Sequence, residues 1–503
     1  MGPSAEASRD RGGIARQVVR GSAYSVAASL ATMSLGFLRT LLLLRFLGPE
    51  AFGVMGMAMV YAAAALQLVD WGLDQGVLHR QARDRPTLAT YGWLRMGTVA
   101  TAALALFLAA PILGALYPRM PELPAVLRGM SLVVLLQGLS FIQETMMSRD
   151  MRFDRRALVD VAAAATMTVV APYLAWRGWG VWALVAEQAS GIGVRALLTW
   201  GPLRMWRPHR GWDPEIARWF VRFGGPLWLS GNIQFLLERF DDFWVGTALG
   251  QEALGLYARA FEFAQYPRRV VAGPLVLVLT PAFARLQGDR RRLSQAFYRG
   301  AYVLLRASLL LSGAMAIALP ELLQLLNPRW LPMVRTFRLM LVYAMLEGWV
   351  ALAGGLLVAT GHPAAMGRMA LARLAFFLPG VVVGAWAGGI DGVALAADGM
   401  MALSALMLHR PLRETVDFSI WPLMGGPLLA WASAGGIGLL IEALSVPSSP
   451  LVRMLLKGML FIGIYVGWLL AFEKGTWREA ASWILMTRQR SAGLLQRPPQ
   501  HPD

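Results

Sequence analysis

The sequence predicts an all-α polytopic membrane protein with about fourteen transmembrane helices. Three observations support this fold class. The 503 residues are 56% hydrophobic and only 15% charged, and their mean hydropathy is +0.50. Stretches such as 96–118 and 418–441 carry no charged residue, and each exceeds the ~20 residues that a helix needs to cross the bilayer. Basic residues gather in short loops between the apolar segments.

The apolar segments predict three groups of spans. The first group covers 21–44, 51–73, 91–115, 125–146, 157–176 and 179–201. The second group covers 225–248, 253–279, 300–320, 333–358, 367–387 and 391–408, and two further spans cover 421–443 and 451–472. The seventh and eighth spans carry charges in their middle, so the sequence leaves open whether these two helices are continuous.

The charge of the loops predicts the orientation of the chain. Arginine-rich loops alternate with loops that hold only scattered arginines, which is the pattern of the positive-inside rule for termini in the cytoplasm. The basic loops are 80–85, 149–156, 204–222, 285–299 and 410–413. The polar segment 1–20 precedes a long apolar run that no soluble domain follows, so we interpret it as a cytoplasmic tail and not as a signal peptide.

A seven-residue motif occurs twice in the chain. Residues 47–53 (Leu-Gly-Pro-Glu-Ala-Phe-Gly) recur 202 positions later as 249–255 (Leu-Gly-Gln-Glu-Ala-Leu-Gly). Residues 183–187 recur 211 positions later as 394–398. Similar offsets at both ends of a block indicate two six-helix halves, and an even number of helices inserts both halves in the same orientation. Parallel repeats of this kind are a transporter architecture with the substrate path between the halves.

The repeat predicts the domain organisation. We expect a cytoplasmic tail over 1–20, an N-lobe over 21–205 and a C-lobe over 220–410, with a central cavity between the lobes. Two additional helices over 421–472 and a second cytoplasmic tail over 473–503 complete the chain.

Charged residues inside the spans mark a candidate substrate site. An ionisable side chain at the bilayer centre costs ~2.5–3.5 kcal/mol and usually faces a partner or a water-filled cavity. If the repeats face each other, the first, second, seventh and eighth helices line that cavity. The candidate substrate-binding residues are Arg39, Glu238, Arg239, Asp241, Asp242, Arg259, Glu262, Arg268 and Arg269.

Both signs of charge have a role in such a cavity. Arginine forks suit a phosphate or diphosphate, because the guanidinium makes two-point contacts with phosphoryl oxygens. The carboxylates balance the arginines or bind a coupling cation, and the sequence does not separate these roles. A purely structural alternative is that the charges form ion pairs between helices. Charges nearer the helix ends are expected to snorkel to the interface, namely Arg95, Glu144, Asp160, Arg306 and Arg373.

Several functional classes find no support in the sequence. The net charge is +17, but the basic residues lie in short membrane-flanking loops, so we expect no nucleic-acid partner. The chain has no cysteine, no phosphate-binding loop and no catalytic or histidine-rich metal motif. The sequence therefore predicts a protein that is not an enzyme and that uses no cofactor.

Residues 21 to about 410 resemble the polysaccharide transporter (oligosaccharide flippase) family. This family belongs to the MOP superfamily, which also contains the MATE drug carriers and the lipid II flippase. The resemblance rests on 45–53, 70–73 and 241–257, and Pro267, 280–286 and Trp330 continue it at the family's spacing. The arginine pair after Pro267 is not expected of the family at large.

The resemblance implies a membrane flippase for a polyprenyl-diphosphate-linked oligosaccharide, used in exopolysaccharide, capsule or O-antigen synthesis. It implies two lobes in alternating access and a place in the bacterial inner membrane. The implied partners are this lipid-linked substrate, membrane lipids, and the polymerase and glycosyltransferases of the same pathway. A cation-coupled small-molecule or drug exporter on the same fold, a polysaccharide polymerase and a non-transporting scaffold are alternatives.

Overall fold

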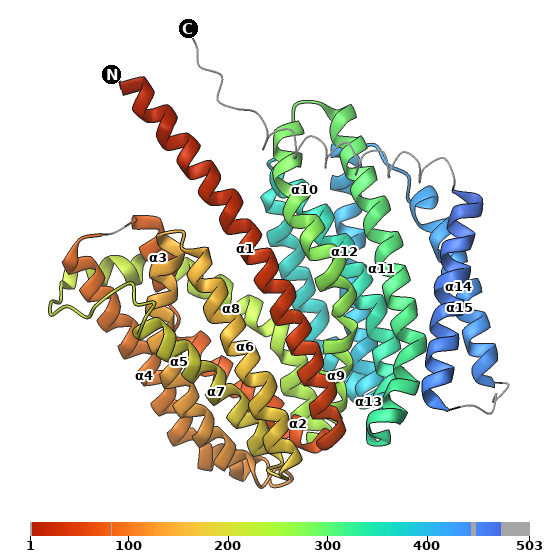
Figure 1. Cartoon of the computed structure of the whole chain (residues 1–503), viewed down its shortest axis with the longest axis horizontal. Helices are drawn as coiled ribbons and strands as arrows, with labels where there is room; N and C mark the ends of the chain where they lie inside the picture. Colours follow the sequence, from red (N-terminus) through yellow and green to blue (C-terminus); the bar gives the residue numbers. More distant parts are fainter. Residues whose placement is uncertain (1–2, 82, 444–448, 474–503) are drawn as a thin grey trace. The chain divides into compact units, whose positions relative to one another are not determined.

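The computed structural model describes residues 3–81, 83–443 and 449–473, and these residues form helices joined by short connections (Figure 1). Before residue 250 the helices are α1 (Pro3–Phe46), α2 (Pro49–Val69), α3 (Leu73–Arg80), α4 (Arg85–Leu116), α5 (Leu123–Arg149), α6 (Phe153–Trp176), α7 (Val181–Trp200) and α8 (Pro214–Ala248). They continue as α9 (Gln251–Ala264), η1 (Arg268–Ala272), α10 (Gly273–Leu286), α11 (Arg290–Leu326), η2 (Pro328–Trp330), α12 (Met333–Ala359), α13 (Pro363–Thr415), α14 (Ile420–Ala443) and α15 (Pro450–Phe472). The predicted all-α polytopic fold is confirmed.

Among the described residues, eleven helical segments are long and apolar enough to cross a membrane, and one of them, Gln251–Leu286, comprises α9, η1 and α10. Another of them, α13, holds two predicted spans, because Gly388 and Gly389 leave the helical conformation and Gly389 has a φ of +58°. The remaining two predicted spans correspond to α8 and α14. The protein is therefore a multi-pass membrane protein.

The seventh and eighth spans have different structures. The seventh is the continuous helix α8, although Pro226 lies inside it. The eighth is divided into α9, η1 and α10, and η1 is a π-helical turn that begins directly after Pro267. Turns of this kind inside helices often occur at functional sites.

Several helices extend beyond the predicted spans. α8 begins at Pro214, eleven residues before the predicted start, and α11 begins at Arg290, ten residues early. Asp213 and Asp289 cap these helices by accepting hydrogen bonds from the backbone amides of Ile216 and Arg292. The reason is physical: a capped helix in water needs no apolar residues, so hydropathy underestimates its length. α1 likewise begins at Pro3, within the segment predicted as a tail.

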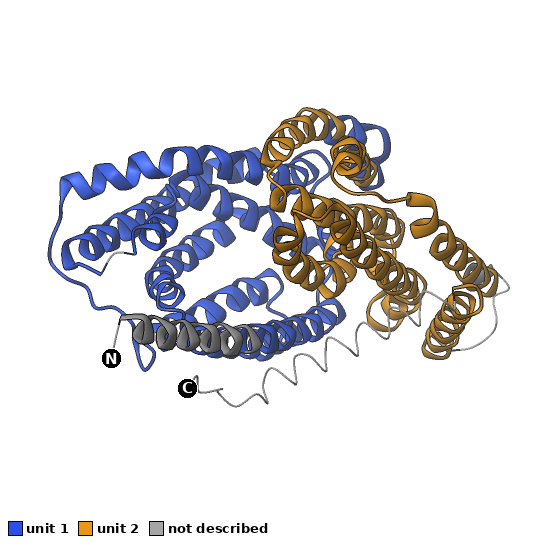
Figure 2. Cartoon of the chain, turned by 90° about the horizontal axis from the view of Figure 1, so that it is seen from above, with its two compact units in different colours: residues 1–259, 381–393 blue, residues 260–380, 394–503 orange. Residues whose placement is uncertain are grey.

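The chain forms two compact units (Figure 2). The first contains residues 1–259 and 381–393, and the second contains 260–380 and 394–503. The lobes 21–205 and 220–410 were predicted from the repeat alone and stay a prediction. The predicted C-terminal tail lies outside the described residues apart from Glu473.

In the first unit, the two copies of the repeated motif contact each other reciprocally. A Cβ at Gly53 would lie 1.7 Å from the carbonyl oxygen of Gln251, and a Cβ at Gly255 would lie 1.9 Å from that of Pro49. Only glycine permits backbones to approach this closely. The last residue of each motif therefore contacts the third residue of the other copy, which explains the glycine in both.

Residues 70–72 form the break between α2 and α3. Gly72 adopts a left-handed conformation, with a φ of +61°. The indole of Trp71 stacks on that of Trp228 at a centroid distance of 5.6 Å. A Cβ at Gly224 would lie 1.7 Å from the carbonyl oxygen of Trp71. The break after α2 therefore packs closely against α8.

In the second unit, buried ion pairs attach α15 and the residue after it to α11. Lys457 pairs with Glu321, and the two side chains are 1% and 4% exposed. Arg306 pairs with Glu473, with Nη2 and Oε1 2.7 Å apart. The adjacent helices α14 and α15, drawn in blue in Figure 1, also contact each other.

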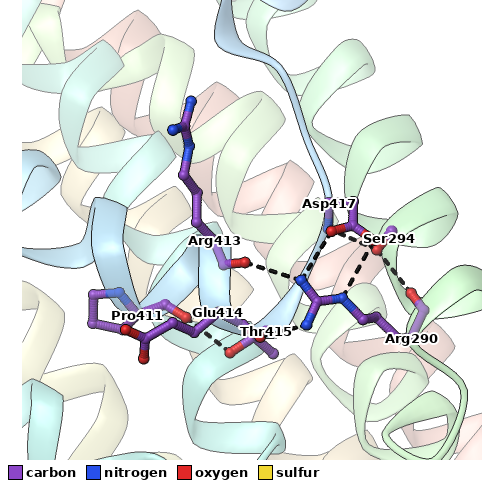
Figure 3. A network of polar contacts seen from close by, with 7 residues as sticks. All are labelled: Arg290, Ser294, Pro411, Arg413, Glu414, Thr415 and Asp417. Carbon is purple, nitrogen blue, oxygen red and sulfur yellow. Dashed lines mark hydrogen bonds and ion pairs between the residues drawn. The ribbon is translucent and has the colours of Figure 1, made fainter.

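A polar network outside the apolar segments connects the beginning of α11 with the end of α13 (Figure 3). Arg290 pairs with the carboxylate of Asp417, with Nη2 and Oδ1 2.9 Å apart, and donates to the carbonyl oxygens of Arg413 and Glu414. The backbone amide of Asp417 donates to the Ser294 hydroxyl over 2.9 Å. The guanidinium of Arg290 holds the pKa of the Asp417 carboxyl below its usual value.

Candidate functional site

The structure distributes the nine predicted site residues over four elements. Arg39 lies on α1, Arg259 and Glu262 lie on α9, and Arg268 and Arg269 lie on η1; the other four lie on α8. The first unit contains six of the nine, and the second contains Glu262, Arg268 and Arg269. We describe the two sets separately.

The charged residues of α8 face different surroundings. Asp241 is buried, and its Oδ2 accepts a hydrogen bond of 2.7 Å from the Tyr257 hydroxyl. Asp242 is paired with Arg239 at 3.4 Å. Glu238 is exposed and accepts a hydrogen bond from Gln234. Part of the cluster therefore faces protein, and part is accessible. The Arg239–Asp242 pair lies within α8, so it is not an ion pair between helices.

The second carboxylate oxygen of Asp241 is the least satisfied atom of this cluster. Oδ1 is buried and has no hydrogen-bond partner among the described residues. Buried polar atoms in proteins almost always have a partner. Asp241 is therefore a candidate for contact with a proton, a cation or a polar ligand group.

The first repeat contributes an aromatic contact to Arg259. The guanidinium carbon lies 4.8 Å from the centroid of the Phe52 ring, within the range of a cation–π interaction. Phe52 belongs to the first copy of the repeated motif, and Arg259 follows the second copy by four residues. The close approach of the two motifs thus also positions this arginine.

In the second unit, η1 presents its two arginines differently. Arg268 pairs with Glu347 on α12, with Nε and Oε2 3.2 Å apart, and Gln265 donates to the same carboxylate oxygen over 3.0 Å. Arg269 is exposed and stacks on Tyr266 at 5.8 Å from the ring centroid. The Arg268 side chain remains 42% exposed, so both arginines are accessible despite their contacts.

Arg39 borders a cavity inside the first unit. Its Nε lies 3.1 Å from Oε1 of Glu187 on α7. The cavity has a volume of about 520 Å³ and lies between α1, α6 and α7. Its polar lining residues are Ser25, Ser29, Thr32, Arg39, Arg156, Asp160 and Arg195.

Several charged side chains have ion-pair partners that could not be identified from the sequence. Arg195 contacts Asp160 and Glu144, with its Nη1 2.7 Å and 3.2 Å from their carboxylate oxygens. Glu187 pairs with Arg39, and Glu347 with Arg268. A signal for Glu187 existed, because it ends the repeated segment 183–187, but nothing in a single sequence indicated its partner.

The repeat relates these charges to one another. The motif offset of 202 takes Arg39 to Asp241, and the later offset of 211 takes Glu187 to Asp398. At these equivalent sequence positions the first half has Arg39 and Glu187, which form an ion pair, and the second half has two aspartates. Like Asp241, Asp398 has a buried Oδ1 without a hydrogen-bond partner among the described residues.

Burial contradicts the expected snorkelling for two of the five charges near helix ends, Arg95 and Arg306. Arg95 is buried and pairs with Asp70 and Asp74, at 3.2 Å and 3.1 Å. Arg306 is buried beside Glu473, and Arg373 donates to the Ser404 hydroxyl over 2.7 Å. Arg95 and Arg306 thus have carboxylate partners inside the protein, which removes the need to reach the interface. Glu144, Asp160 and Arg373 also have partners but are partly exposed, so snorkelling stays a prediction for them.

Comparison with known sequences gives a family and several relatives. The model of a family described as "Polysaccharide biosynthesis protein" matches residues 42–335. The succinoglycan biosynthesis transport protein ExoT of Rhizobium meliloti is 28% identical over 63% of this chain, and the match covers 64% of that protein, just under two thirds. The lipopolysaccharide biosynthesis protein WzxC of Escherichia coli is 24% identical over 75% of this chain and 77% of that protein.

Solved structures with the same fold include two kinds of transporter. The lipid II flippase MurJ, in an inward closed conformation, superposes with a TM-score of 0.71 over 91% of this chain and 99% of its own, at 11% identity. An inward-facing MATE family multidrug resistance transporter superposes with a TM-score of 0.59 over 77% of this chain and 97% of its own, at 15% identity. At these identities the likeness concerns the fold.

Proposed function

The chain belongs to the family described as "Polysaccharide biosynthesis protein", and on that premise we propose that it is a flippase for a polyprenyl-diphosphate-linked oligosaccharide. The repeat unit would cross from the inner to the outer leaflet for exopolysaccharide, capsule or O-antigen synthesis. Relatives named for succinoglycan transport and for lipopolysaccharide and amylovoran biosynthesis support this substrate class. The observation that carries the proposal is accessible charge of both signs on α8 and η1, inside predicted spans.

These charges fit a substrate with an anionic head and a lipid tail. The tail stays in the bilayer, so only the sugar diphosphate needs a polar route. Arg268 and Arg269 offer guanidinium groups for the diphosphate, and the nearby Glu347 balances Arg268 when substrate is absent. An inside-negative potential favours outward movement of an anion by about 2.3 kcal/mol per charge per 100 mV.

The mechanism that we propose is alternating access of the lobes 21–205 and 220–410, with the helices over 421–472 as an addition. The protein would lie in the bacterial inner membrane with both termini in the cytoplasm, and it would work beside the polymerase and glycosyltransferases of its pathway. It would not be an enzyme. The short connections support this, because none of those between the described spanning helices is long enough for a catalytic domain. The longest are 201–213 and 70–84, and the second of these contains α3.

A drug exporter on the same fold fits the chain less well. The MATE match covers 77% of the chain, whereas the MurJ match covers 91%. The guanidinium groups of Arg268 and Arg269 also favour an anionic ligand over a cationic drug.

The test is deletion of the gene in its native host, followed by lipid extraction and mass spectrometry. We expect undecaprenyl-linked repeat units to accumulate on the inner leaflet while the polymer disappears from the cell surface. Complementation with the wild-type chain should restore the polymer, whereas Arg268→Ala combined with Arg269→Ala should not at equal abundance. Normal polymer and no accumulated lipid in the deletion strain would refute the proposal.

A further inference from the structure

We propose that the cavity between α1, α6 and α7 is a subsite for a neutral sugar residue of the transported molecule, an inference that rests on the proposed function. The cavity lies wholly within the first unit. Its volume of about 520 Å³ falls within the ~300–1,000 Å³ of small-molecule sites. The residues that line the cavity favour a sugar over the diphosphate as its ligand.

The charges around the cavity balance. Arg39 and Arg195 line it, and they are paired with Glu187, Asp160 and Glu144. The lining itself holds three arginines, the third being Arg156, and one carboxylate, that of Asp160. Glu187 and Glu144 pair with Arg39 and Arg195 from outside the lining. A diphosphate would be repelled by Asp160 and would compete with all three carboxylates for the guanidinium groups. A neutral ligand meets no such repulsion.

The donors and acceptors of the lining suit sugar hydroxyls. A hydroxyl both donates and accepts, so it can bridge a guanidinium and a carboxylate. Ser25, Ser29 and Thr32 follow one another at spacings of four and three on α1 and therefore share a face. The Thr32 hydroxyl donates to the carbonyl oxygen of Ala28 over 2.9 Å, which leaves its lone pairs for a ligand donor.

The lining also has an apolar part. Phe153 and Met167 contribute to it together with three alanines. A pyranose ring has C–H faces as well as hydroxyl edges, so a lining of both kinds can contact it on both. An inorganic anion or a diphosphate would leave this apolar surface without a partner.

The ion pairs of the cavity remain within reach of a ligand. The side chains of Arg39, Arg195 and Asp160 are 18%, 28% and 31% exposed. The structural pair Lys457–Glu321, by contrast, is 1% and 4% exposed. The cavity pairs thus resemble a preformed polar surface more than a closed interhelical contact. Arg39, which the sequence suggested as a phosphate ligand, is assigned here to the sugar.

The test uses Thr32→Cys, which carries a single thiol because the natural chain has no cysteine. The purified variant in liposomes is labelled with a small maleimide in the presence of two probes. One probe is the lipid-linked oligosaccharide extracted from the deletion strain, and the other is undecaprenyl diphosphate without sugar. We expect the first to slow labelling about tenfold near ten times its Kd, and the second to leave labelling unchanged.

Two results would overturn the inference while leaving the proposed function intact. Equal protection by undecaprenyl diphosphate would identify a phosphate or prenyl site. Unchanged labelling at concentrations of the glycan lipid that saturate binding to the protein would exclude the cavity as a ligand site. Failure of the proposed function would be recognised separately, because the deletion strain would then yield no lipid-linked oligosaccharide.

A second pair of variants tests the same inference without a cysteine. Asp160→Asn removes a cavity carboxylate, and Asp154→Asn is its matched control on α6, in an exposed pair with Arg152. We expect Asp160→Asn to weaken binding of the glycan lipid about tenfold, or 1.4 kcal/mol, and to leave undecaprenyl diphosphate binding unchanged. Equal affinities for the glycan lipid in both variants would contradict the sugar subsite.

Discussion

Asp241 differs from its charged neighbours on α8 because it is buried and only half satisfied. Tyr257 donates to one carboxylate oxygen, and the other has no hydrogen-bond partner among the residues described. Ion pairing compensates Asp242, and exposure compensates Glu238. Ionisable residues inside membrane spans are usually functional. We therefore expect the Asp241 carboxylate to bind a proton or a ligand group in another state of the molecule.

We expect Asp241→Asn to reduce polymer export by at least about tenfold without loss of the protein from the membrane. The amide keeps the size of the side chain but removes its charge. Export is measured by complementation of the deletion strain, with abundance measured by immunoblot. Glu215→Gln, an exposed change on the same helix, serves as the matched control and should export normally. Full export by Asp241→Asn would remove it from the site.

The buried Lys457–Glu321 ion pair stabilises the fold and is not part of the candidate site. We expect Lys457→Met to lower the free energy of unfolding by about 3–5 kcal/mol, because it leaves Glu321 buried without its partner. The double variant Lys457→Met with Glu321→Leu should recover most of this loss, because it leaves no unpaired charge at this position. Thermal unfolding of the purified protein in detergent measures both. A double variant no more stable than the single one would contradict this account.

At the scale of elements, the contact between the beginnings of α2 and α9 depends on two glycines. We expect Gly53→Ala to lower the free energy of unfolding by about 1–3 kcal/mol, because the new Cβ would overlap the Gln251 carbonyl. Gly255→Ala should have the same effect, because its Cβ would overlap the Pro49 carbonyl. Gly36→Ala on α1 is the control, since a Cβ there meets nothing within 4 Å.

The separation of α2 from α9 can be followed through Leu254, which is 1% exposed. In the cysteine-free background, Leu254→Cys should react slowly with maleimide. Addition of Gly53→Ala should accelerate this reaction several-fold, and addition of Gly36→Ala should not. Identical rates in all three chains would show that the reciprocal contact does not keep these helices together.

The Arg290–Asp417 network predicts a dependence on pH. Arg290 lowers the pKa of Asp417. The stabilising contribution of their ion pair is therefore complete above the unfolded-state pKa of the carboxyl, about 3.9. It is lost as the pH falls through the lower folded-state value. We expect Asp417→Asn to accelerate hydrogen exchange over 416–419 about twofold to fivefold at pH 7.

The same measurement at low pH provides the check. After correction for intrinsic exchange rates, wild type and Asp417→Asn should converge once the pH falls below the lowered folded-state pKa of Asp417. Glu414→Gln, which removes the exposed partner of Arg410, should behave as wild type at both pH values. Protection of wild type relative to Asp417→Asn that persists at the lowest pH would contradict the ion-pair account, because both chains keep the backbone hydrogen bond to Ser294.

At the scale of the whole molecule, the loop charges predict which side each connection faces. Arg119→Cys should react with an impermeant maleimide in intact spheroplasts, and Arg210→Cys only after permeabilisation. Both side chains are exposed, so access depends on the side of the membrane. Reaction of both residues from the same side would mean that the spans between them were miscounted.

The spans could be predicted because burial of long apolar stretches in lipid is a property of local sequence. Helix ends could not, because caps such as Asp213 and Asp289 lie in polar sequence. The charges of the candidate site were likewise found from local sequence, whereas their partners depend on tertiary contacts. Arg39 and Glu187 lie on α1 and α7, and no local pattern joins them. For the same reason Arg95 and Arg306 were wrongly expected at the interface.

The pair Arg306–Glu473 also has a consequence for the order of events during synthesis. Its two members are 167 residues apart. At ~5–20 residues per second, the ribosome adds Glu473 roughly 10–30 s after Arg306. Throughout that interval Arg306 is without its final carboxylate partner. A nascent chain that has not been extended to Glu473 therefore holds Arg306 in α11 without the carboxylate that pairs with it in the folded protein.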